Sequence, residues 1–220
     1  MSRLWPATLE RGHVRLRPIT YRDRQAWQAV RARNVDWLRP WDATLPPGAS
    51  DAATTFRGMV RTLRASARAG TTMPFALDVD GTFRGQVTVG SIHFGSLRGG
   101  HIGYWIDREA AGDGVMPMAV AMATDHCFAN GLHRIEINIR PENGPSIRVV
   151  EKVGFRYEGL RERYLHIDGD WRDHVSYALT VEEVDEPLAD RFARLYGEPK
   201  GINTRTRRPN PGSGEGRTVG

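Results

Sequence analysis

The segment GYWIDREAAGDGVMPMAVAMATDHCFANGLHRIEINIR, residues 103–140, decides the fold. Its first residues and the alternating run 134–140 are typical of strands. Residues 115–129 are apolar on nearly every side, which indicates a largely buried helix. A Gly112-Asp113-Gly114 loop precedes this helix, and Asn130-Gly131 ends it. A strand, a helix and a second strand in this order form a crossover unit, so the two strands are expected to be parallel.

The flanking sequence extends this unit into one α/β domain with a mixed sheet. The strands expected from apolar patterning are residues 13–19, 72–79, 83–94, 101–107, 134–140, 155–167 and 171–180. The expected helices are residues 20–33, 50–70, 115–129, 143–154 and 185–196. We expect a domain over residues 10–184, a C-terminal helix over 185–196 and a disordered, basic, Gly/Pro-rich tail over 197–220.

Composition excludes several classes of protein. The chain has 220 residues, 40% of them hydrophobic and 26% charged, as in ordinary globular domains. Its one cysteine, Cys127, excludes a disulfide framework and a cysteine-based zinc site, and it is expected in the core. No apolar run approaches about 18 residues, and the start lacks a secretory signal, so a cytoplasmic location is expected. Residues 197–220 carry +3 of the net charge of +5, which makes RNA contact through the tail one interpretation.

The Gly112-Asp113-Gly114 loop predicts an anion site. Glycines let backbone N–H groups turn toward a ligand, and a helix N-terminus adds about half a positive charge. The sequence holds no G-x-x-x-x-G-K-[ST] motif, and Pro117 interrupts the pattern G-x-G-x-x-G of dinucleotide-binding folds. A phosphate cradle outside those two classes is therefore indicated.

Three motifs resemble the Gcn5-related N-acetyltransferases: GYWID at 103–107, the Gly112-x-Gly114 loop, and RPENGPSIRVVEKVGF at 140–155. The runs VRLRPIT at 14–20 and DWLRPW at 36–41 resemble the subgroup that includes the ribosomal-protein N-terminal-alanine acetyltransferases. The resemblance covers about residues 10–182. It implies a mixed, splayed central sheet flanked by helices, with acetyl-CoA bound between the two central parallel strands and no metal.

The resemblance also implies the cofactor contacts. The pyrophosphate would lie on the backbone of Ala111, Gly112, Asp113, Gly114, Val115 and Met116. The pantetheine arm would pair with Tyr104, Trp105, Ile106 and Asp107. Asn143 would face the pantetheine or fix the splay, and Ser146 would lie near the sulfur. Glu109 and Asp113 depart from the family pattern, and each carboxylate beside a pyrophosphate would cost on the order of 1 kcal/mol if partly exposed.

Acetyl transfer to an amine needs a base, donors to the oxyanion and an acid for the thiolate. The resemblance implies direct transfer in a ternary complex and an oxyanion donor in the backbone N–H near Ile106. The glutamate and tyrosine used by N-terminal-alanine enzymes correspond here to Asn138 and Val150, which cannot perform those roles. Ser146 is then the candidate acid, or a hydrogen-bond donor to the thiolate. Glu136, on the same strand face as Asn138, is the candidate base.

The acceptor side is expected to include four residues. Trp37 and Trp41 would line the entrance, and Tyr164 and His166 share a face of a late strand. The leading hypothesis is an acetyl-CoA-dependent N-acetyltransferase acting on a primary amine, above all a protein N-terminus of the ribosomal-alanine type. The alternatives are transfer to a small amine or antibiotic, use of succinyl-CoA, and a catalytically weak acyl-CoA-binding module whose tail contacts RNA or protein. The sequence leaves open the acceptor, the donor, the base and whether the chain forms a homodimer.

Overall fold

A computed structural model of the chain describes residues 4–49 and 55–202. The tail beyond Ile202, with its predicted disorder and RNA contact, lies outside the described residues. None of the helices in the described parts of the chain has the length and apolar character needed to cross a membrane.

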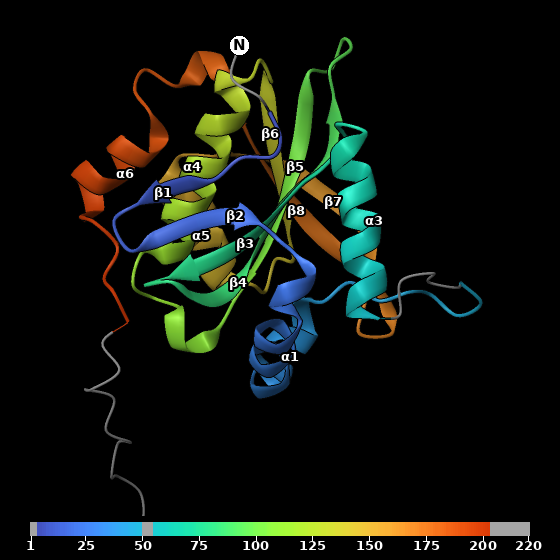
Figure 1. The fold of residues 1–220 in the computed structure, drawn as a ribbon. Helices are drawn as coiled ribbons and strands as arrows, with labels where there is room; N and C mark the ends of the chain where they lie inside the picture. The colour runs from blue at the N-terminus through green and yellow to red at the C-terminus, as the bar shows by residue number, and fades with distance from the viewer. Residues whose placement is uncertain (1–3, 50–54, 203–220) are drawn as a thin grey trace, which may run out of the picture.

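The centre of the molecule is an eight-stranded mixed sheet with the order β1-β2-β3-β4-β5-β6-β8-β7 (Figure 1). Its strands are β1 (Leu9–Arg11), β2 (Val14–Pro18), β3 (Met73–Val79), β4 (Thr82–His93), β5 (Gly99–Ile106), β6 (Arg134–Ile139), β7 (Arg156–Ile167) and β8 (Asp170–Thr180). β5 and β6 are parallel, whereas the other neighbours pair antiparallel. The mixed α/β sheet and its central parallel pair are thus confirmed.

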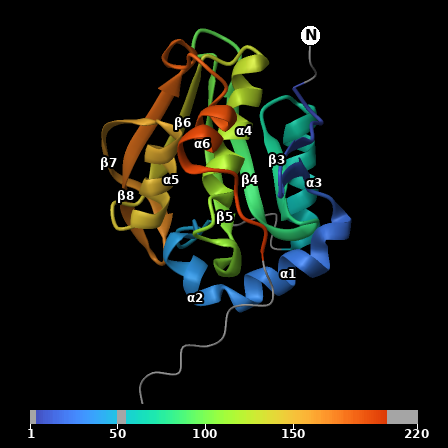
Figure 2. The same cartoon turned by 90° about the vertical axis from the view of Figure 1, so that its left-hand side faces the viewer.

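Helices cover both faces of the sheet. The helices are α1 (Arg24–Arg33), α2 (Val35–Leu38), α3 (Phe56–Arg68), α4 (Val115–Ala129), α5 (Gly144–Val153) and α6 (Leu188–Tyr196). In Figure 1, α4, α5 and α6 lie to the left of the sheet and α3 lies to its right, and Figure 2 looks onto the face that carries α4 and α6. The sheet therefore separates two apolar layers, of which the one around α4 is the larger.

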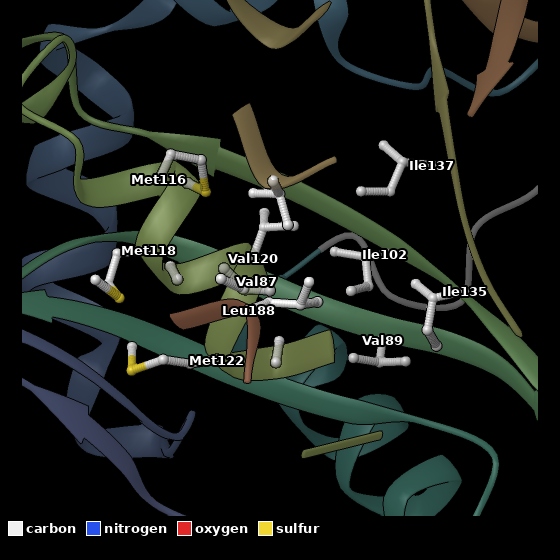
Figure 3. Packing of buried hydrophobic residues seen from close by; sticks show 14 of the residues in the cluster. Val87, Val89, Ile102, Met116, Met118, Val120, Met122, Ile135, Ile137 and Leu188 are labelled. Atoms are coloured by element: carbon white, nitrogen blue, oxygen red, sulfur yellow. The ribbon is translucent and has the colours of Figure 1, made fainter. Parts of the chain in front are cut away.

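The apolar character of α4 follows from its position. The helix lies against the sheet on one side and α6 on another, so Met118, Val120 and Ala121 are all fully buried. Figure 3 shows residues of this layer from α4, the central strands and α6: Met116, Met118, Val120, Met122, Val87, Val89, Ile102, Ile135, Ile137 and Leu188. Cys127 is buried here too, as expected, and burial raises the pKa of its thiol.

The sheet splays between its two parallel strands. β5 pairs with β6 only from Gly99–Arg134 to His101–Glu136. Beyond these pairs β6 continues beside β8 as far as Ile139, while β5 continues beside β4 as far as Ile106. The carboxyl ends of the parallel strands consequently diverge and leave a gap, as the family resemblance implied.

One helix begins later than the sequence predicts, and two short elements were not predicted. The C-terminal helix begins at Leu188 rather than residue 185, because Pro187 is its N-cap and Asp125 accepts the N–H groups of Leu188 and Ala189. The short elements β1 and α2 were not predicted, since three or four residues carry too little periodicity.

The beginning of the predicted disordered tail needs correction. Residues 197–202 lie against the domain: Pro199 is buried, the Lys200 N–H donates to the Asp113 carbonyl (3.2 Å), and the Ile202 N–H donates to Asp80 (3.0 Å). Backbone hydrogen bonds and the burial of Pro199 hold this segment in place despite its composition.

Candidate active site

The splay opens into a cavity of about 490 Å³. Twelve of the residues predicted from sequence line it: Trp37, Trp41, Tyr104, Trp105, Ile106, Ala111, Gly112, Gly114, Val115, Met116, Asn143 and Ser146. Five predicted residues lie outside the lining: Asp107, Asp113, Glu136, Tyr164 and His166. The cavity therefore brings the loop, the splayed strand, the start of α5 and the two tryptophans together.

The glycine loop forms one end of the cavity. Gly112 and Gly114 have φ of +96° and +80°, values that glycine adopts without strain, and Gly114 caps α4. The first N–H groups of a helix have no partner within it and favour an anion. α5 contributes two basic side chains to the same lining, Arg148 and Lys152, which are one helical turn apart. These residues fit the phosphates of CoA.

The end of β5 offers an N–H group to the gap. Asp107 N–H donates to the Arg84 carbonyl of β4 (2.7 Å), and successive residues of a strand direct their N–H groups to opposite sides. The N–H of Ile106 is therefore directed away from β4, toward the gap. The Ile106 carbonyl accepts from Trp37 Nε1 (3.1 Å). This geometry agrees with the predicted oxyanion donor near Ile106.

Tyr104, Asn143 and Ser146 form one hydrogen-bonded group across the groove. The Tyr104 hydroxyl lies 2.7 Å from Ser146 Oγ and 3.3 Å from the Ser146 carbonyl. Asn143 caps α5 by accepting the Ser146 N–H (3.1 Å). Burial raises the pKa of Tyr104 well above its ordinary value, although Ser146 lowers it slightly. The phenol therefore stays protonated and can donate.

The carboxylate of Asp107 is fully buried, and Asp107 is not among the residues that line the cavity. Arg33, Arg84 and Asn34 all donate to its carboxylate, the last two at 2.8 Å. Burial alone would raise the pKa of Asp107, but these donors outweigh it and lower the pKa to about 2. The ion pairs fasten α1 and β4 to the end of β5. Local sequence patterns could not reveal these ion pairs, because the partners are 23 to 74 positions away.

The two carboxylates that departed from the family pattern lie outside the cavity lining. Glu109 pairs with Arg84 at 3.0 Å, so its charge is partly neutralised. The backbone of Asp113 carries the contact with Lys200 that holds the C-terminal segment. Neither side chain forms part of the surface on which the phosphates are expected to rest.

Glu136 is held by cationic groups away from the cavity. Arg134 donates to it at 2.9 Å, Arg161 donates at 2.7 Å, and His101 Nε2 lies 3.2 Å from its second oxygen. Burial alone would raise its pKa, but Arg134, with smaller contributions from His101 and Arg161, lowers it. Glu136 also lies outside the cavity lining, so its carboxylate does not contact a substrate bound there. The geometry therefore gives no support to the predicted catalytic role of Glu136.

Tyr164 and His166 support the hairpin of β7 and β8. Tyr164 packs edge-on against His174, with ring centroids 5.5 Å apart. His166 is buried, and its Nδ1 lies 2.8 Å from the Thr44 hydroxyl. The His166 carbonyl accepts the Thr44 N–H at 2.8 Å. His166 thus fixes the chain just after the cavity wall, and neither residue reaches the cavity itself.

Several lining residues were missed from the sequence: Asp42, Gln86, Thr88, Arg148 and Lys152. The spacing of Arg148 and Lys152 on a helix face was a usable signal. Gln86 and Thr88, which are hydrogen-bonded at 3.0 Å, alternate on β4, but alternation alone does not say which face opens on a cavity. Among the described residues, no group of three or more metal-ligating side chains is placed to hold a metal ion.

Comparisons with known proteins agree with this geometry. The family model for the acetyltransferase (GNAT) domain matches residues 13–156. The [ribosomal protein uS5]-alanine N-acetyltransferase of Escherichia coli K12 is 30% identical in an alignment of 172 positions that covers 73% of this chain and 85% of the relative. YjcK of Bacillus subtilis, a probable N-acetyltransferase, is 40% identical over 43% of this chain, and that match spans 53% of YjcK's length.

A solved structure resembles the whole domain. Mycobacterium smegmatis RimJ in complex with CoA-disulfide superposes with a TM-score of 0.82 and 42% sequence identity, covering 89% of this chain and 97% of that one. A ribosomal-protein-S5-alanine acetyltransferase from Vibrio fischeri superposes with a TM-score of 0.71 and 28% identity, over 82% and 100% of the two chains.

Proposed function

The chain belongs to the acetyltransferase (GNAT) domain family, and from that premise we propose that it transfers the acetyl group of acetyl-CoA to the α-amino group of a protein N-terminus. The similarity to the uS5-alanine N-acetyltransferase and to RimJ supports this class of acceptor. A ribosomal protein as acceptor implies that the enzyme works in the cytoplasm.

One observation carries the proposal: a single cavity joins the anion-binding end of α4 to a wall of three tryptophans. The three tryptophans are Trp37, Trp41 and Trp105, and the same cavity is lined by Gly112 and Gly114 of the loop. Such a continuous space allows donor and acceptor to be bound together. Transfer can then proceed directly, without a covalent enzyme intermediate.

Different groups of the cavity bind the phosphates, stabilise the oxyanion and donate to the sulfur. Acetyl-CoA supplies the activated thioester when bound. The backbone N–H groups at the start of α4, with Arg148 and Lys152, hold its phosphates. The Ile106 N–H stabilises negative charge on the thioester oxygen, and Ser146, hydrogen-bonded to Tyr104, donates to the sulfur as the C–S bond breaks.

A donor and acceptor panel tests the proposal. The full chain is incubated with acetyl-CoA or succinyl-CoA and with peptides that start with alanine or serine. Matched acceptors are N-terminally blocked peptides containing lysine, small amines and aminoglycoside antibiotics. The proposal predicts the highest kcat/KM for acetyl-CoA with a free peptide N-terminus. A preference for small amines, or binding of acetyl-CoA with no turnover of any amine, would overturn it.

A further inference from the structure

An amine acceptor needs a partner for its nitrogen. An α-amine has a pKa of about 7.7–8.0, so near neutral pH it arrives largely as a cation and must lose a proton to react. Its nitrogen becomes positive again as the new N–C bond forms. A carboxylate next to the nitrogen would stabilise this charge in the transition state more than the neutral amine. Glu136 and His166 lie outside the cavity lining, so this position needs another residue.

Asp42 is the one acidic side chain among the described residues that line the cavity. It follows Trp41 directly, at the end of the tryptophan-bearing segment that forms the acceptor wall. Its side chain is 34% exposed, so it is accessible from the cavity without being fully hydrated. The anion is therefore on the acceptor side, away from the phosphate-binding end.

Arg31 holds the carboxylate of Asp42 in a bidentate ion pair. Nη1 donates to Oδ1 at 3.0 Å, and Nη2 donates to Oδ2. The guanidinium of Arg31 lies over the ring of Trp105 at 5.3 Å and over Trp27 at 5.6 Å. Two such bonds occupy one lone pair on each oxygen, and the remaining lone pairs are free to accept an N–H group of the acceptor.

The backbone on both sides of Asp42 is also fixed. Its N–H donates to the Leu38 carbonyl at 3.1 Å, and two residues later Thr44 is hydrogen-bonded to His166. Between them Ala43 forms a bridge with Ile167 at the end of β7. A side chain held this firmly loses little further entropy when it binds a ligand.

We propose that Asp42 binds the acceptor nitrogen and accepts a proton from it during transfer. The N–C bond forms and the C–S bond breaks; one N–H proton passes to the Asp42 carboxylate and then to solvent, and the thiolate takes up one proton through Ser146. This inference rests on the proposed function as an amine acetyltransferase. It holds for any amine acceptor, so it can be tested separately from the identity of the acceptor.

Two variants at this position and one control test the role. Asp42→Asn keeps the shape and loses the charge, whereas Asp42→Glu restores the charge. Asp36→Asn is the matched control, because Asp36 is exposed on the neighbouring helix α2 and is not part of the lining. We expect Asp42→Asn to lower kcat/KM for an alanine-terminated peptide by about 10²-fold, with Asp42→Glu partly restoring it and Asp36→Asn without effect. Calorimetry should give the same acetyl-CoA Kd for all four proteins.

A second acceptor separates a chemical role from a structural one. In this peptide an aminooxy group replaces the N-terminal amine. The aminooxy nitrogen is uncharged at neutral pH and gives up its proton far more easily during transfer. Asp42→Asn should therefore lose at least about tenfold less kcat/KM with this acceptor than with the amine. Equal losses with both acceptors, a weakened acetyl-CoA Kd, or an Asp42→Asn enzyme as active as wild type would each overturn the inference.

The wild-type panel distinguishes this inference from the proposed function. If the enzyme acetylates small amines and no peptide, the N-terminal substrate is wrong, and the Asp42 comparison is made with the amine that reacts. If the wild type binds acetyl-CoA and acetylates no amine, both proposals fail.

Discussion

The hydroxyl of Tyr104 lies 2.7 Å from Oγ of Ser146, which joins the splayed end of β5 to the first turn of α5. The phenol stays protonated, because burial raises its pKa. Tyr104 can therefore donate to Ser146 and leave the serine proton free for the sulfur of the leaving group.

Removing either hydroxyl should slow the chemical step. We predict that Ser146→Ala lowers kcat by about 10²-fold and Tyr104→Phe by about tenfold, each with little change in the acetyl-CoA Kd. Because the two hydroxyls act together, the double variant should have about the same kcat as Ser146→Ala alone. Steady-state kinetics with calorimetric Kd values checks this. Fully additive losses would show that the two hydroxyls act independently.

Glu136→Gln should leave catalysis nearly unchanged. Its carboxylate is outside the cavity lining and bound by Arg134, Arg161 and His101. We expect kcat/KM within about threefold of wild type at every pH, since no transition-state contact is lost. A loss of about 10²-fold at neutral pH, together with loss of the acidic limb of the pH profile, would restore Glu136 as the base.

Asp107 should make the free energy of unfolding depend on pH in the acidic range. Its pKa is about 2 in the fold and about 3.9 when unfolded, so its carboxylate contributes roughly 2–3 kcal/mol. The contribution is complete above about pH 4 and disappears as the pH falls toward 2. Asp107→Asn should therefore be less stable than wild type at neutral pH, and the difference should shrink in acid. Urea unfolding across this range measures it, with Asp36→Asn as the control that should show no such trend.

Gly85 should be intolerant of any side chain. A Cβ at this position would collide with the Trp105 carbonyl and lie 3.1 Å from Cα of Ile106, so β4 and β5 would have to separate beside the cavity. We predict that Gly85→Ala lowers the free energy of unfolding by about 1–3 kcal/mol and weakens acetyl-CoA binding. Gly90→Ala is the matched control, because a Cβ there meets no atom within 4 Å. Equal effects of both substitutions would contradict the predicted close approach.

The sequence was informative where local pattern determines structure. The alternation of residues 134–140, the apolar run 115–129 and the loop between Gly112 and Gly114 predicted the parallel pair and the anion site. Each depends on backbone geometry within a few residues. The cofactor half of the cavity could be anticipated for that reason.

The acceptor half depends on contacts between distant segments, which local pattern does not contain. Strand alternation placed Glu136 on the same strand face as Asn138. It could not show that Arg134 and Arg161 bind the Glu136 carboxylate. His166 was predicted to contact the acceptor, but its ring is hydrogen-bonded to the Thr44 hydroxyl and lies outside the cavity lining. Asp42 was overlooked because only the ion pair with Arg31 and the turn after Trp41 bring it into the cavity.

The most direct test of the central claim uses one peptide that carries both a free N-terminal alanine and an internal lysine. The full chain is mixed with this peptide and acetyl-CoA, and tandem mass spectrometry locates the acetyl group. We predict one acetyl group on the α-nitrogen, formed only when acetyl-CoA is present. Acetyl on the lysine alone, or an unmodified peptide in the presence of an enzyme that binds acetyl-CoA, would contradict it.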